Sequence, residues 1–384
     1  MKNYDIAIVG AGILGVAHAF FALKNDLKVA LLEKEAAPQA ATVRNFGQIV
    51  PSGMDNKWQA LGRQSLAVYK AIQAQVDISV RQEGSIYIAS DAEEMRLLEE
   101  LAKINKGNDY ASTLLSKEEC LQKYPGLKSD YVLGGLFFPE EVTLDPRVAI
   151  HRIITFLREQ YSLDYYPNTS IHHIETGKAG HQLINNQKLA IQAAKVLICS
   201  GSDFQTLYPK VFKNSDLKYV KLQMLSTYPQ TGLKIPGSIL TGWTIRRYES
   251  FQECPSYVQI KAKEDPAAFH RQWGIHILFK QSADGRVIIG DSHEYQAVNE
   301  EKSLDFQMDS AINEAIIQEA KRIYTLPNFK IEKSWIGIYS QCQERDIFEA
   351  EPLPDVHIVT GIGGKGMTGS FGWAEQNIKR LFHS

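Results

Sequence analysis

The sequence predicts an α/β fold, α+β overall, in which a Rossmann-type domain carries an inserted antiparallel-sheet domain. Two observations support this prediction. A strand–helix–strand pattern fills the first 33 residues, and a late strand, a glycine-rich turn and a helix close the chain. Between these ends, residues 220–290 are mostly typical of short strands. Nucleotide-binding features at both ends indicate a discontinuous first domain with a second domain inserted in it.

The length of 384 residues, 44% of them hydrophobic, suits two domains with large cores. We expect the first domain at residues 1–80, 145–215 and 335–384. The second domain, which would bind the substrate, is expected at residues 81–144 and 216–334.

The opening pattern carries the most information. Tyr4–Val9 is a short apolar run of the kind that forms a buried strand, and Gly10-Ala11-Gly12 ends it. Ile13–Lys24 follows with a helical pattern. Leu27–Glu33 then reads as a second strand that ends in an acid. The β-α-β unit takes about 30 residues, as in dinucleotide-binding units.

The other expected elements follow from hydrophobic periodicity and turn residues. Asp145 and Pro146 suit the N-cap and the first turn of a helix that runs to about Gln160. Further helices are expected at 55–76, 92–106, 304–324 and after residue 366, and strands at 84–89, 133–139, 194–201, 274–279, 286–290 and 356–360.

The segment from Gly10 to Gly15 matches the GxGxxG pattern of dinucleotide-binding turns. Gly10 permits the tight turn, Gly12 lets the backbone approach a pyrophosphate, and Gly15 lets helix and strand pack closely. Glu33 lies 18 residues after Gly15, at the end of the second strand. Its carboxylate would accept hydrogen bonds from a ribose and repel a 2′-phosphate. In this context, a glycine turn without a ligand is the weaker alternative.

A second glycine-rich turn, 361–366, stands just before the last helix. So many glycines are costly to order without a ligand, although a flexible C-terminal turn is the alternative. The N-terminus of the helix would favour the negative charge that develops on a reduced flavin, and Lys365 would strengthen that field. The position of this turn favours FAD over NAD.

The composition argues against nucleic-acid binding, a metal site and a membrane span. The chain has 42 Lys and Arg against 44 Asp and Glu, and no basic run indicates nucleic acid. Cys120, Cys199, Cys254 and Cys342 form no CxxC pair, so we expect no metal site and a reducing, cytoplasmic location. No apolar stretch reaches the roughly 18 residues that a membrane span needs, and the start does not resemble a signal peptide.

These residues resemble the D-amino-acid oxidase, glycine oxidase and sarcosine oxidase-like family of FAD enzymes, over essentially the whole chain. Segments 5–33, 42–48, 196–201, 221–223 and 361–368 carry the resemblance. Segments 44–47, 290–295 and 363–368 also resemble a clade associated with phosphonate catabolism. Members of that clade are proposed to oxidise amines related to 2-aminoethylphosphonate.

The resemblance implies a set of FAD-binding residues that comes from both ends of the chain. The implied set is Gly10, Ala11, Gly12, Ile13, Leu14 and Gly15 at the pyrophosphate; Glu33, Lys34 and Ile171 at the adenosine; Thr42, Arg44, Asn45, Gly47 and Gln48 in a loop that reaches the flavin ring; Ser200 and Gly201 at the ribityl phosphate; and Gly363, Gly364, Lys365, Gly366, Met367 and Thr368 at the pyrimidine end of the flavin.

Two departures from the family matter. Relatives that attach FAD covalently use a cysteine where this chain has Gly337, so we expect non-covalent FAD. Cys342 lies nearby, but only an exposed thiol of low pKa would attach a flavin. Many amino-acid oxidases carry a carboxylate-binding arginine where this chain has Ile338 and Tyr339. The usual carboxylate clamp is therefore missing or has moved.

Basic residues of the middle region are the candidates for holding an acidic substrate. His276 and Lys280 lie four apart on an expected strand, so their side chains would share a face. His293 would follow the next strand, Arg44 would reach the flavin front, and Tyr339 completes the set. The structural alternatives stay open, because a strand histidine often only bridges neighbours and Lys280 would ordinarily be solvated.

Three further arginines are open candidates. Arg345 follows the segment of Tyr339, and Arg246 and Arg247 are adjacent. On a strand, adjacent side chains face opposite ways, so at most one of that pair would point toward a ligand.

The expected function is FAD-dependent oxidation of a small primary or secondary amine, with hydride transfer to flavin N5 and hydrolysis of the imine. The expected substrate is anionic, an aminophosphonate or an amino acid, and oxygen or another acceptor would re-oxidise the flavin. No residue stands out as a certain catalyst, because this chemistry needs mainly orientation and a dry pocket. The alternatives are an NAD-dependent dehydrogenase and a non-catalytic flavin-binding protein.

Overall fold

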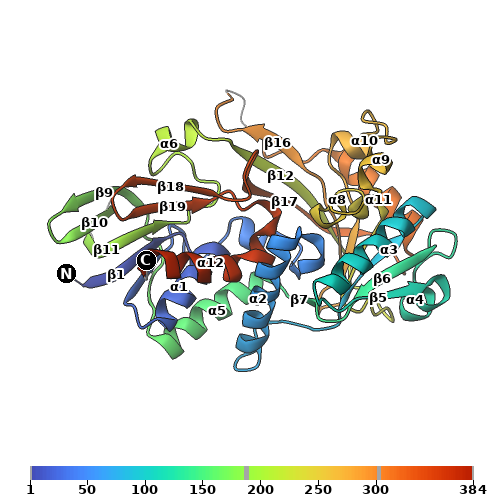
Figure 1. Cartoon of the computed structure of the whole chain (residues 1–384), viewed down its shortest axis with the longest axis horizontal. Coiled ribbons are helices and arrows are strands. Elements are labelled where there is room, and N and C mark those ends of the chain that lie inside the picture. The colour runs from blue at the N-terminus through green and yellow to red at the C-terminus, as the bar shows by residue number, and fades with distance from the viewer. Residues whose placement is uncertain (1, 186–189, 301–303, 383–384) are drawn as a thin grey trace.

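The computed structural model describes residues 2–185, 190–300 and 304–382 and contains two large β-sheets with helices around them (Figure 1). In Figure 1 the sheet with β1 (Asn3–Val9) and β11 (Ala190–Ile198) lies on the left, and the strands β5 (Thr113–Ser116), β6 (Gly134–Phe138) and β7 (Val142–Thr143) lie on the right. The expected fold class is confirmed. Within the described ranges, no helix is both long and apolar enough to cross a membrane.

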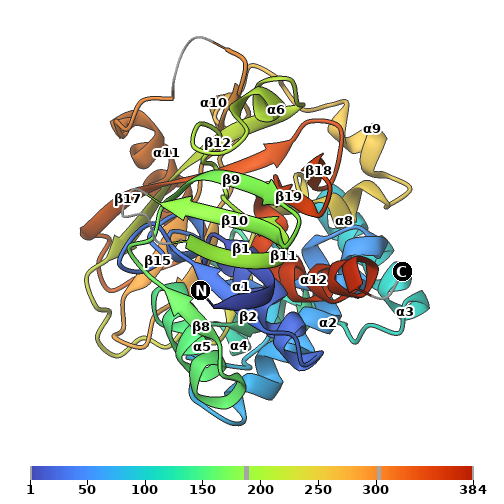
Figure 2. The ribbon, with the colours of Figure 1, turned by 90° about the vertical axis from the view of Figure 1, so that its left-hand side faces the viewer.

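The first sheet has a parallel core around β1, which pairs with β2 on one side and β11 on the other. Its strands β2 and β1 are mostly buried because helices cover the sheet, as expected for parallel strands (Figure 2). In the described part of the chain its eight strands are, in sheet order, β18 (Phe348–Leu353), β19 (Val356–Thr360), β11 (Ala190–Ile198), β1 (Asn3–Val9), β2 (Val29–Leu32) and β8 (Asp164–Tyr166), with β10 (Gly180–Asn185) paired to β11 and β9 (Ile171–Gly177) paired to β10.

The C-terminal helix completes the N-terminal unit. Helix α12 (Gly366–Phe382) packs against α1 (Ile13–Lys24) and α2 (Asn56–Gln73). Gly372 allows the close approach, since a Cβ there would lie 2.2 Å from the Leu61 carbonyl oxygen. Strands β1 and β19 both run parallel to β11, so their carboxyl ends reach the same edge of the sheet. This topology brings the two glycine-rich turns together.

The second sheet is mostly antiparallel. Its long strand β12 pairs with β15, β16 and β17. Among the described residues its nine strands are β16 (Glu294–Ala297), β12 (Leu217–Thr227), β15 (Val287–Gly290), β14 (Leu278–Gln281), β13 (Ser238–Leu240), β4 (Ser85–Ala89), β6 (Gly134–Phe138) and β5 (Thr113–Ser116) in sheet order, with β17 (Ile331–Cys342) beside β12.

The remaining elements connect these two sheets. A short ribbon pairs β3 (Gln48–Ile49) with β7 (Val142–Thr143). The other helices are α3 (Ala92–Gly107), α4 (Lys117–Lys123), α5 (Pro146–Tyr161), α6 (Pro209–Lys213), α7 (Gly242–Ile245), α8 (Glu249–Gln252), α9 (Tyr257–Lys261), α10 (Phe269–Gln272) and α11 (Ser310–Ile323), with 3-10 turns at Ala41–Val43, Pro51–Gly53 and Gly363–Lys365.

Two expected elements differ in the structure. The strand-rich reading of residues 220–290 is wrong between Gly242 and Gln272, where the structure has the four short helices α7 to α10. Buried Phe251 and Cys254 lie three apart, a helical spacing rather than the alternation of a strand. The helix expected from residue 304 begins at Ser310, because the Asp309 side chain caps it by accepting from the Ala311 N–H.

Strand β17 crosses one of the expected domain boundaries. Residues 335–342 were expected in the first domain, yet they belong to β17, which pairs with β12 of the second sheet along its length. Strand β17 therefore leads from the second sheet directly to the nucleotide-binding region.

Candidate active site

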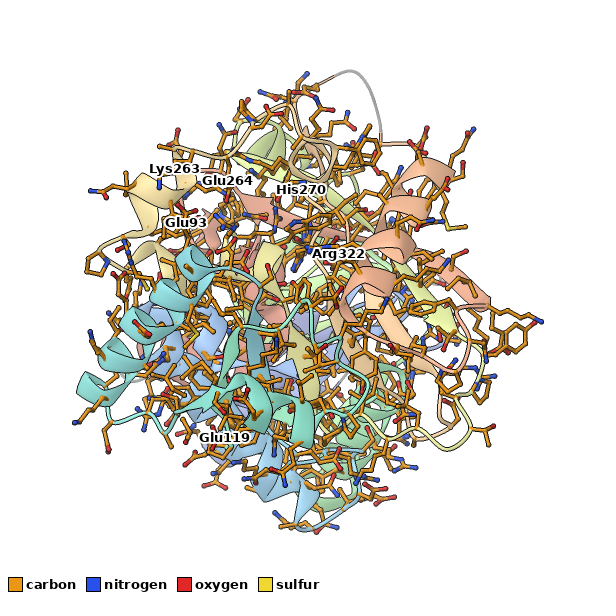
Figure 3. All side chains as sticks on the ribbon, turned by 90° about the vertical axis from the view of Figure 1, so that its right-hand side faces the viewer. Glu93, Glu119, Lys263, Glu264, His270 and Arg322 are labelled. Carbon is orange, nitrogen blue, oxygen red and sulfur yellow. The ribbon has the colours of Figure 1, made fainter. Side chains whose placement is uncertain are left out.

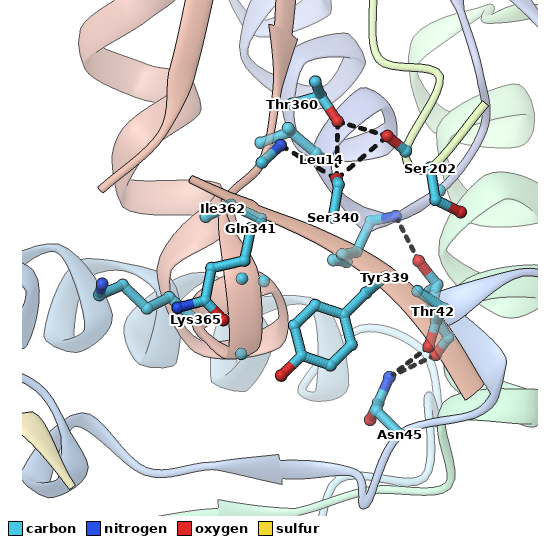
Figure 4. Close-up of a pocket in the computed structure, with 18 of the residues that line it drawn as sticks. Leu14, Thr42, Asn45, Ser202, Tyr339, Ser340, Gln341, Thr360, Ile362 and Lys365 are labelled. Atoms are coloured by element: carbon cyan, nitrogen blue, oxygen red, sulfur yellow. Dashed lines mark hydrogen bonds between the residues drawn. The ribbon is translucent and has the colours of Figure 1, made fainter. Parts of the chain in front are cut away.

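A cavity of about 1070 Å³ lies where the two sheets meet. Its walls include the turn after β1, the segment 40–48, the turn after β11, strand β17 and the segment 361–368. Figure 4 shows the ring of Tyr339 extending into it between Asn45 and Gln341. The volume matches the upper range of ligand pockets, and its walls join both ends of the chain.

Two glycines of the first turn are required by the fold, and the third faces the cavity. Gly10 has a φ of +104°, and a Cβ there would lie 2.3 Å from the Cys199 carbonyl oxygen. A Cβ on Gly15 would lie 2.0 Å from the Gly10 carbonyl oxygen. Gly12 lines the cavity and has only the Thr42 hydroxyl, at 3.2 Å, near its missing side chain. Gly12 thus leaves open space where the sequence predicts the pyrophosphate.

Glu33 stands beside this turn. Its buried carboxylate accepts hydrogen bonds from the N–H groups of Ala11 and Glu35, both at 3.1 Å, and it lines the cavity. Lys34, expected at the ribose too, also lines the cavity, but its ammonium pairs with Asp203 at 2.8 Å. The carboxylate of Glu33 keeps acceptor capacity for the hydroxyl groups of a ribose.

The segment from Thr42 to Gln48 is held by its own side chains. Asn45 donates to the Ala41 and Thr42 carbonyls and accepts from the Gly47 N–H. Arg44 donates to the carbonyls of Gln39 and Ile336, so its guanidinium ties this loop to β17. The buried Gln48 amide nitrogen has no hydrogen-bond partner among the described residues and lines the cavity. An unpaired buried donor of this kind indicates a missing ligand atom.

The second glycine-rich turn closes the opposite wall. Thr360 and Ser340 both donate to the Gly201 carbonyl, which joins the turn after β11 to β17 and β19 (Figure 4). Residues Gly363 to Thr368 all line the cavity. The ammonium of Lys365 pairs with Glu249 at 2.8 Å and with Asp346 at 3.3 Å. These two carboxylates offset the charge that was expected to act on a flavin.

The residues present fit an FAD held without a covalent bond. The implied FAD-binding residues line this cavity, except Ala11 and Gly15, which shape the turn from behind. Burial, with the charge of Asp216, raises the pKa of the Cys342 thiol to about 12, so it carries little of the thiolate that attachment would need. Gly337, the position where the resemblance would place a flavin-attaching cysteine, lines the cavity.

Four charged or titratable side chains gather on the second-sheet side of the cavity: Arg247, His276, Asp291 and His293. His276 Nε2 lies 2.7 Å from Asp291 Oδ1, and the rings of His276 and His293 are 5.3 Å apart. His276 Nδ1 contacts the Thr244 hydroxyl at 3.2 Å, and His293 Nδ1 contacts the Gly274 carbonyl at 3.1 Å. Both imidazoles are therefore held at Nδ1, and Nε2 of His276 faces Asp291.

Three tyrosines border this group: Tyr248, Tyr295 and Tyr339. Arg247 donates to the Tyr295 hydroxyl at 2.7 Å. The Tyr248 ring meets His276 edge-on, and the Tyr339 ring meets His293 edge-on. The result is a small aromatic pocket with charged groups at its base.

The residues of this group shift one another's pKa values. Burial acts to raise the pKa of Asp291, but the charges of His276, His293 and Arg247 outweigh it and hold that pKa below the usual value. Burial and the charge of Arg247 lower the pKa of His293 to about 3. Burial also lowers the pKa of His276, against the pull of Asp291. Asp291 is therefore ionised and His293 neutral at pH 7.

The predicted substrate residues are only partly brought together. His276, His293, Tyr339 and Arg44 line the cavity, although His276 precedes strand β14 rather than lying on it. Lys280 does not line the cavity and is not solvated, since its buried ammonium donates to the Leu144 carbonyl at 2.7 Å. Burial lowers the pKa of Lys280 to about 8.

The three open arginines also separate. Arg345 pairs with Asp216 at 2.5 Å. Arg246 is held by four carboxylates outside the cavity, and Arg247 lines it, so one of the adjacent pair points in. They follow helix α7 rather than lying on a strand.

Sequence reasoning missed Asp291 and gave Arg247 no special weight. The signal for Asp291 was its place in the segment 290–295, directly after a strand and two residues before His293. His276, Asp291 and His293 also place ligand atoms within 4.8 Å of one another, a spacing that a metal ion could use. The sequence predicts no metal, and the nearby guanidinium of Arg247 opposes a cation there.

Comparisons with known proteins identify the family of the chain. Residues 5–377 match the family described as FAD dependent oxidoreductase. One polypeptide of the opine oxidase of Rhizobium meliloti is 23% identical over 240 residues, which cover 59% of this chain and 64% of that protein. The glycerol 3-phosphate dehydrogenase of Caloramator mitchellensis is 30% identical over 139 residues, 35% of this chain and 29% of that protein. The matches thus span less than two thirds of these relatives.

The fold has close structural relatives. The crystal structure of glycine oxidase from Geobacillus kaustophilus superimposes with a TM-score of 0.76 at 18% identity, and covers 99% of this chain and 95% of that one. At this identity, the likeness shows a shared fold.

Proposed function

Because the chain belongs to the FAD dependent oxidoreductase family, we propose that it oxidises a small, acidic primary or secondary amine, an aminophosphonate or an amino acid. Bound FAD would supply the hydride acceptor, and oxygen or another acceptor would re-oxidise it. The observation that carries the proposal is the group formed by half-buried Arg247 with buried His276, Asp291 and His293, which shares one cavity with the two glycine-rich turns.

Charge complementarity favours a substrate with both signs of charge. The planar guanidinium of Arg247 suits a carboxylate or phosphonate, and His293 can add a neutral hydrogen bond. The carboxylate of Asp291 suits an ammonium group. Burying either charge without a partner is costly, so a small amine with an acidic group satisfies the site better than a neutral amine does.

Arg247 is a better candidate for binding the acid group of the substrate than the basic residues that the sequence suggested. The guanidinium of Arg44 is occupied by two backbone carbonyls, which suits a role in shaping the loop. The ammonium of Lys280 donates a hydrogen bond to the Leu144 carbonyl, next to Gly47. We therefore assign the acid group of the substrate to Arg247, with Tyr295 as the residue that orients the guanidinium.

The names of the relatives indicate two kinds of substrate that could give the hydride, an amine and an alcohol. Glycine oxidase acts on an amine, as its name says, and the glycerol 3-phosphate dehydrogenase acts on an alcohol that carries a phosphate. Both donors carry an acidic group, which agrees with an arginine in the pocket. Asp291 favours the amine, because a carboxylate beside an ammonium is stabilising and a carboxylate beside a phosphate is not.

An anaerobic reduction screen tests the proposal. Bleaching of the flavin absorbance would be followed after addition of glycine, sarcosine, D-alanine, 2-aminoethylphosphonate and its N-methyl and 1-hydroxy derivatives. Ethylamine serves as the neutral control, and glycerol 3-phosphate as the alcohol. We expect at least one acidic amine to reduce the flavin far faster than ethylamine does. Reduction by ethylamine or glycerol 3-phosphate alone would contradict the proposal, and no reduction at all would favour a non-catalytic flavin protein.

A further inference from the structure

We infer that Asp291, paired with His276, is the group that takes the proton from the ammonium of the substrate before oxidation. The inference rests on the proposed function, because it concerns an amine donor. An amine must be neutral to release a hydride from the adjacent carbon, whereas small amines are mostly ammonium ions at neutral pH. A proton acceptor inside the cavity would let the enzyme work below the pKa of its substrate.

The geometry leaves Asp291 open to a ligand. Its side chain is buried, and Oδ1, although 2.7 Å from His276 Nε2, receives no aligned hydrogen bond from the described residues. The His276 ring is fixed from its other side by Thr244, which in turn contacts the Ile277 carbonyl. A buried carboxylate with an unsatisfied oxygen is expected to have a partner, and a substrate ammonium supplies one.

The other acids and bases of the cavity are unsuited to this role. Among the described carboxylates that line it, only Glu33 and Asp291 are buried, and Glu33 is held in the dinucleotide turn by two backbone N–H groups. Burial and Arg247 hold the pKa of His293 at about 3, so His293 accepts protons poorly. His276 touches Asp291 and would share the proton rather than compete for it.

Substrate binding would itself raise the proton affinity of Asp291. Its charged or titratable neighbours come from every packed element: Arg247 and Tyr248 after α7, His276 before β14, His293 after β15, and Tyr339 on β17. Arg247 is the fixed positive charge of this set, and an acidic substrate group would neutralise it. With that charge offset, burial favours the neutral form of the carboxyl group.

The step balances without a further reactant. One N–H bond of the ammonium breaks, its electron pair stays on the nitrogen, and the proton forms an O–H bond with Asp291. Two buried opposite charges become two neutral groups, which a low-dielectric cavity favours. His276 can then accept the proton from Asp291 through their contact and pass it on after the product leaves.

The pH dependence of anaerobic flavin reduction tests this role in the holoenzyme. With the best acidic amine from the screen, the limiting reduction rate of Asp291→Asn should fall about 100-fold at pH 7. It should recover as the pH approaches the ammonium pKa of the free amine, so that its profile lies at higher pH than that of wild type. His276→Gln should shift the profile in the same direction by less.

An equilibrium measurement separates this role from a structural one. Acetate binding, followed by the change in flavin absorbance, should be several-fold tighter in Asp291→Asn because a negative charge opposite Arg247 is gone. A damaged pocket would bind acetate more weakly. Asp355→Asn and His181→Gln, which change the same residue types outside the cavity, should keep the wild-type profile and acetate affinity.

Three outcomes would overturn the inference. They are an unshifted pH profile in Asp291→Asn, weaker acetate binding in that variant, or a stoichiometric metal ion whose removal by EDTA slows reduction. Failure of the proposed function would look different, because wild-type flavin would then resist every amine at every pH.

Discussion

Arg246 and Arg247 are neighbours in sequence and serve opposite purposes. Arg246 contacts Asp91 at 2.7 Å and buried Glu94 at 2.9 Å, with Glu93 and Glu264 farther out. Figure 3 shows Glu93, Lys263 and Glu264 close together on this face. Arg247 instead turns into the cavity and contacts Tyr295. The guanidinium of Arg246 ties the end of α7 to the start of α3, and that of Arg247 faces the cavity.

This contrast predicts opposite phenotypes for the two methionine substitutions. Arg246→Met leaves the buried Glu94 carboxylate without its cation and should lower the free energy of unfolding by about 3–5 kcal/mol. Arg247→Met should unfold nearly as wild type does, but should weaken binding of an acidic amine by about 10- to 100-fold, the value of a charged hydrogen bond. Chemical denaturation and anaerobic titration measure the two effects. Equal losses of stability in both variants would contradict the assignment.

Glu141 is a buried acid that the proposed chemistry does not use. Burial raises the pKa of its carboxyl group to about 7, although Ser85, Ser52 and Tyr110 contact it and oppose the shift. This folded pKa lies above the unfolded value of 4.5, so the folded protein holds the proton of Glu141 more tightly than the unfolded chain does. The resulting stabilisation is fully present below pH 4.5 and is lost as the pH rises to about 7. The loss amounts to at most about 3 kcal/mol.

Glu141→Gln should therefore flatten the pH dependence of stability between pH 5 and 8. The amide can keep an acceptor for the Ser52 N–H and can donate to the Ser85 hydroxyl. Unfolding free energies from urea titrations at several pH values would show the change. If the two proteins lost stability in parallel as the pH rose, the pKa of Glu141 would not be the cause.

At the scale of elements, the turn between β1 and α1 combines a structural and a binding role. In Gly12→Ala the added methyl group would lie near only the Thr42 hydroxyl, so the apoprotein should fold. The methyl group would face the predicted pyrophosphate. We expect FAD affinity to fall about tenfold, or about 1.4 kcal/mol. Gly10→Ala meets a backbone carbonyl at a positive φ and should lower stability as well. Flavin titration of each apoprotein distinguishes them, and unchanged FAD affinity in Gly12→Ala would contradict the site.

Elements with strong local signals were predictable from sequence. The β-α-β unit, the Asp145-capped helix α5 and the last strand and helix all follow from apolar periodicity and turn residues. Helices α7 to α10 were not, because each has only four or five residues and their packing against the second sheet decides their conformation. The place of Arg247 depends on those short helices, which is why the residues of the pocket were harder to predict than those of the nucleotide turns.

At the scale of the whole molecule, the cavity depends on long-range pairing. Strand β19 and helix α12 return to the N-terminal unit, and β17 brings Tyr339 from the second sheet to the same wall. The sequence indicates each turn separately, and family resemblance joined them around one cofactor. The segment 290–295 also carried a resemblance, but the resemblance gave Asp291 no role, because His276 and Arg247 approach it from distant segments.

Flavin analysis of the purified protein tests the central claim most directly. We predict one FAD per chain, recovered entirely in the supernatant after acid precipitation, because both glycine-rich turns hold it and Cys342 does not bond to it. A folded protein that is colourless and takes up no added FAD, or a flavin that stays attached to the precipitated chain, would contradict the account.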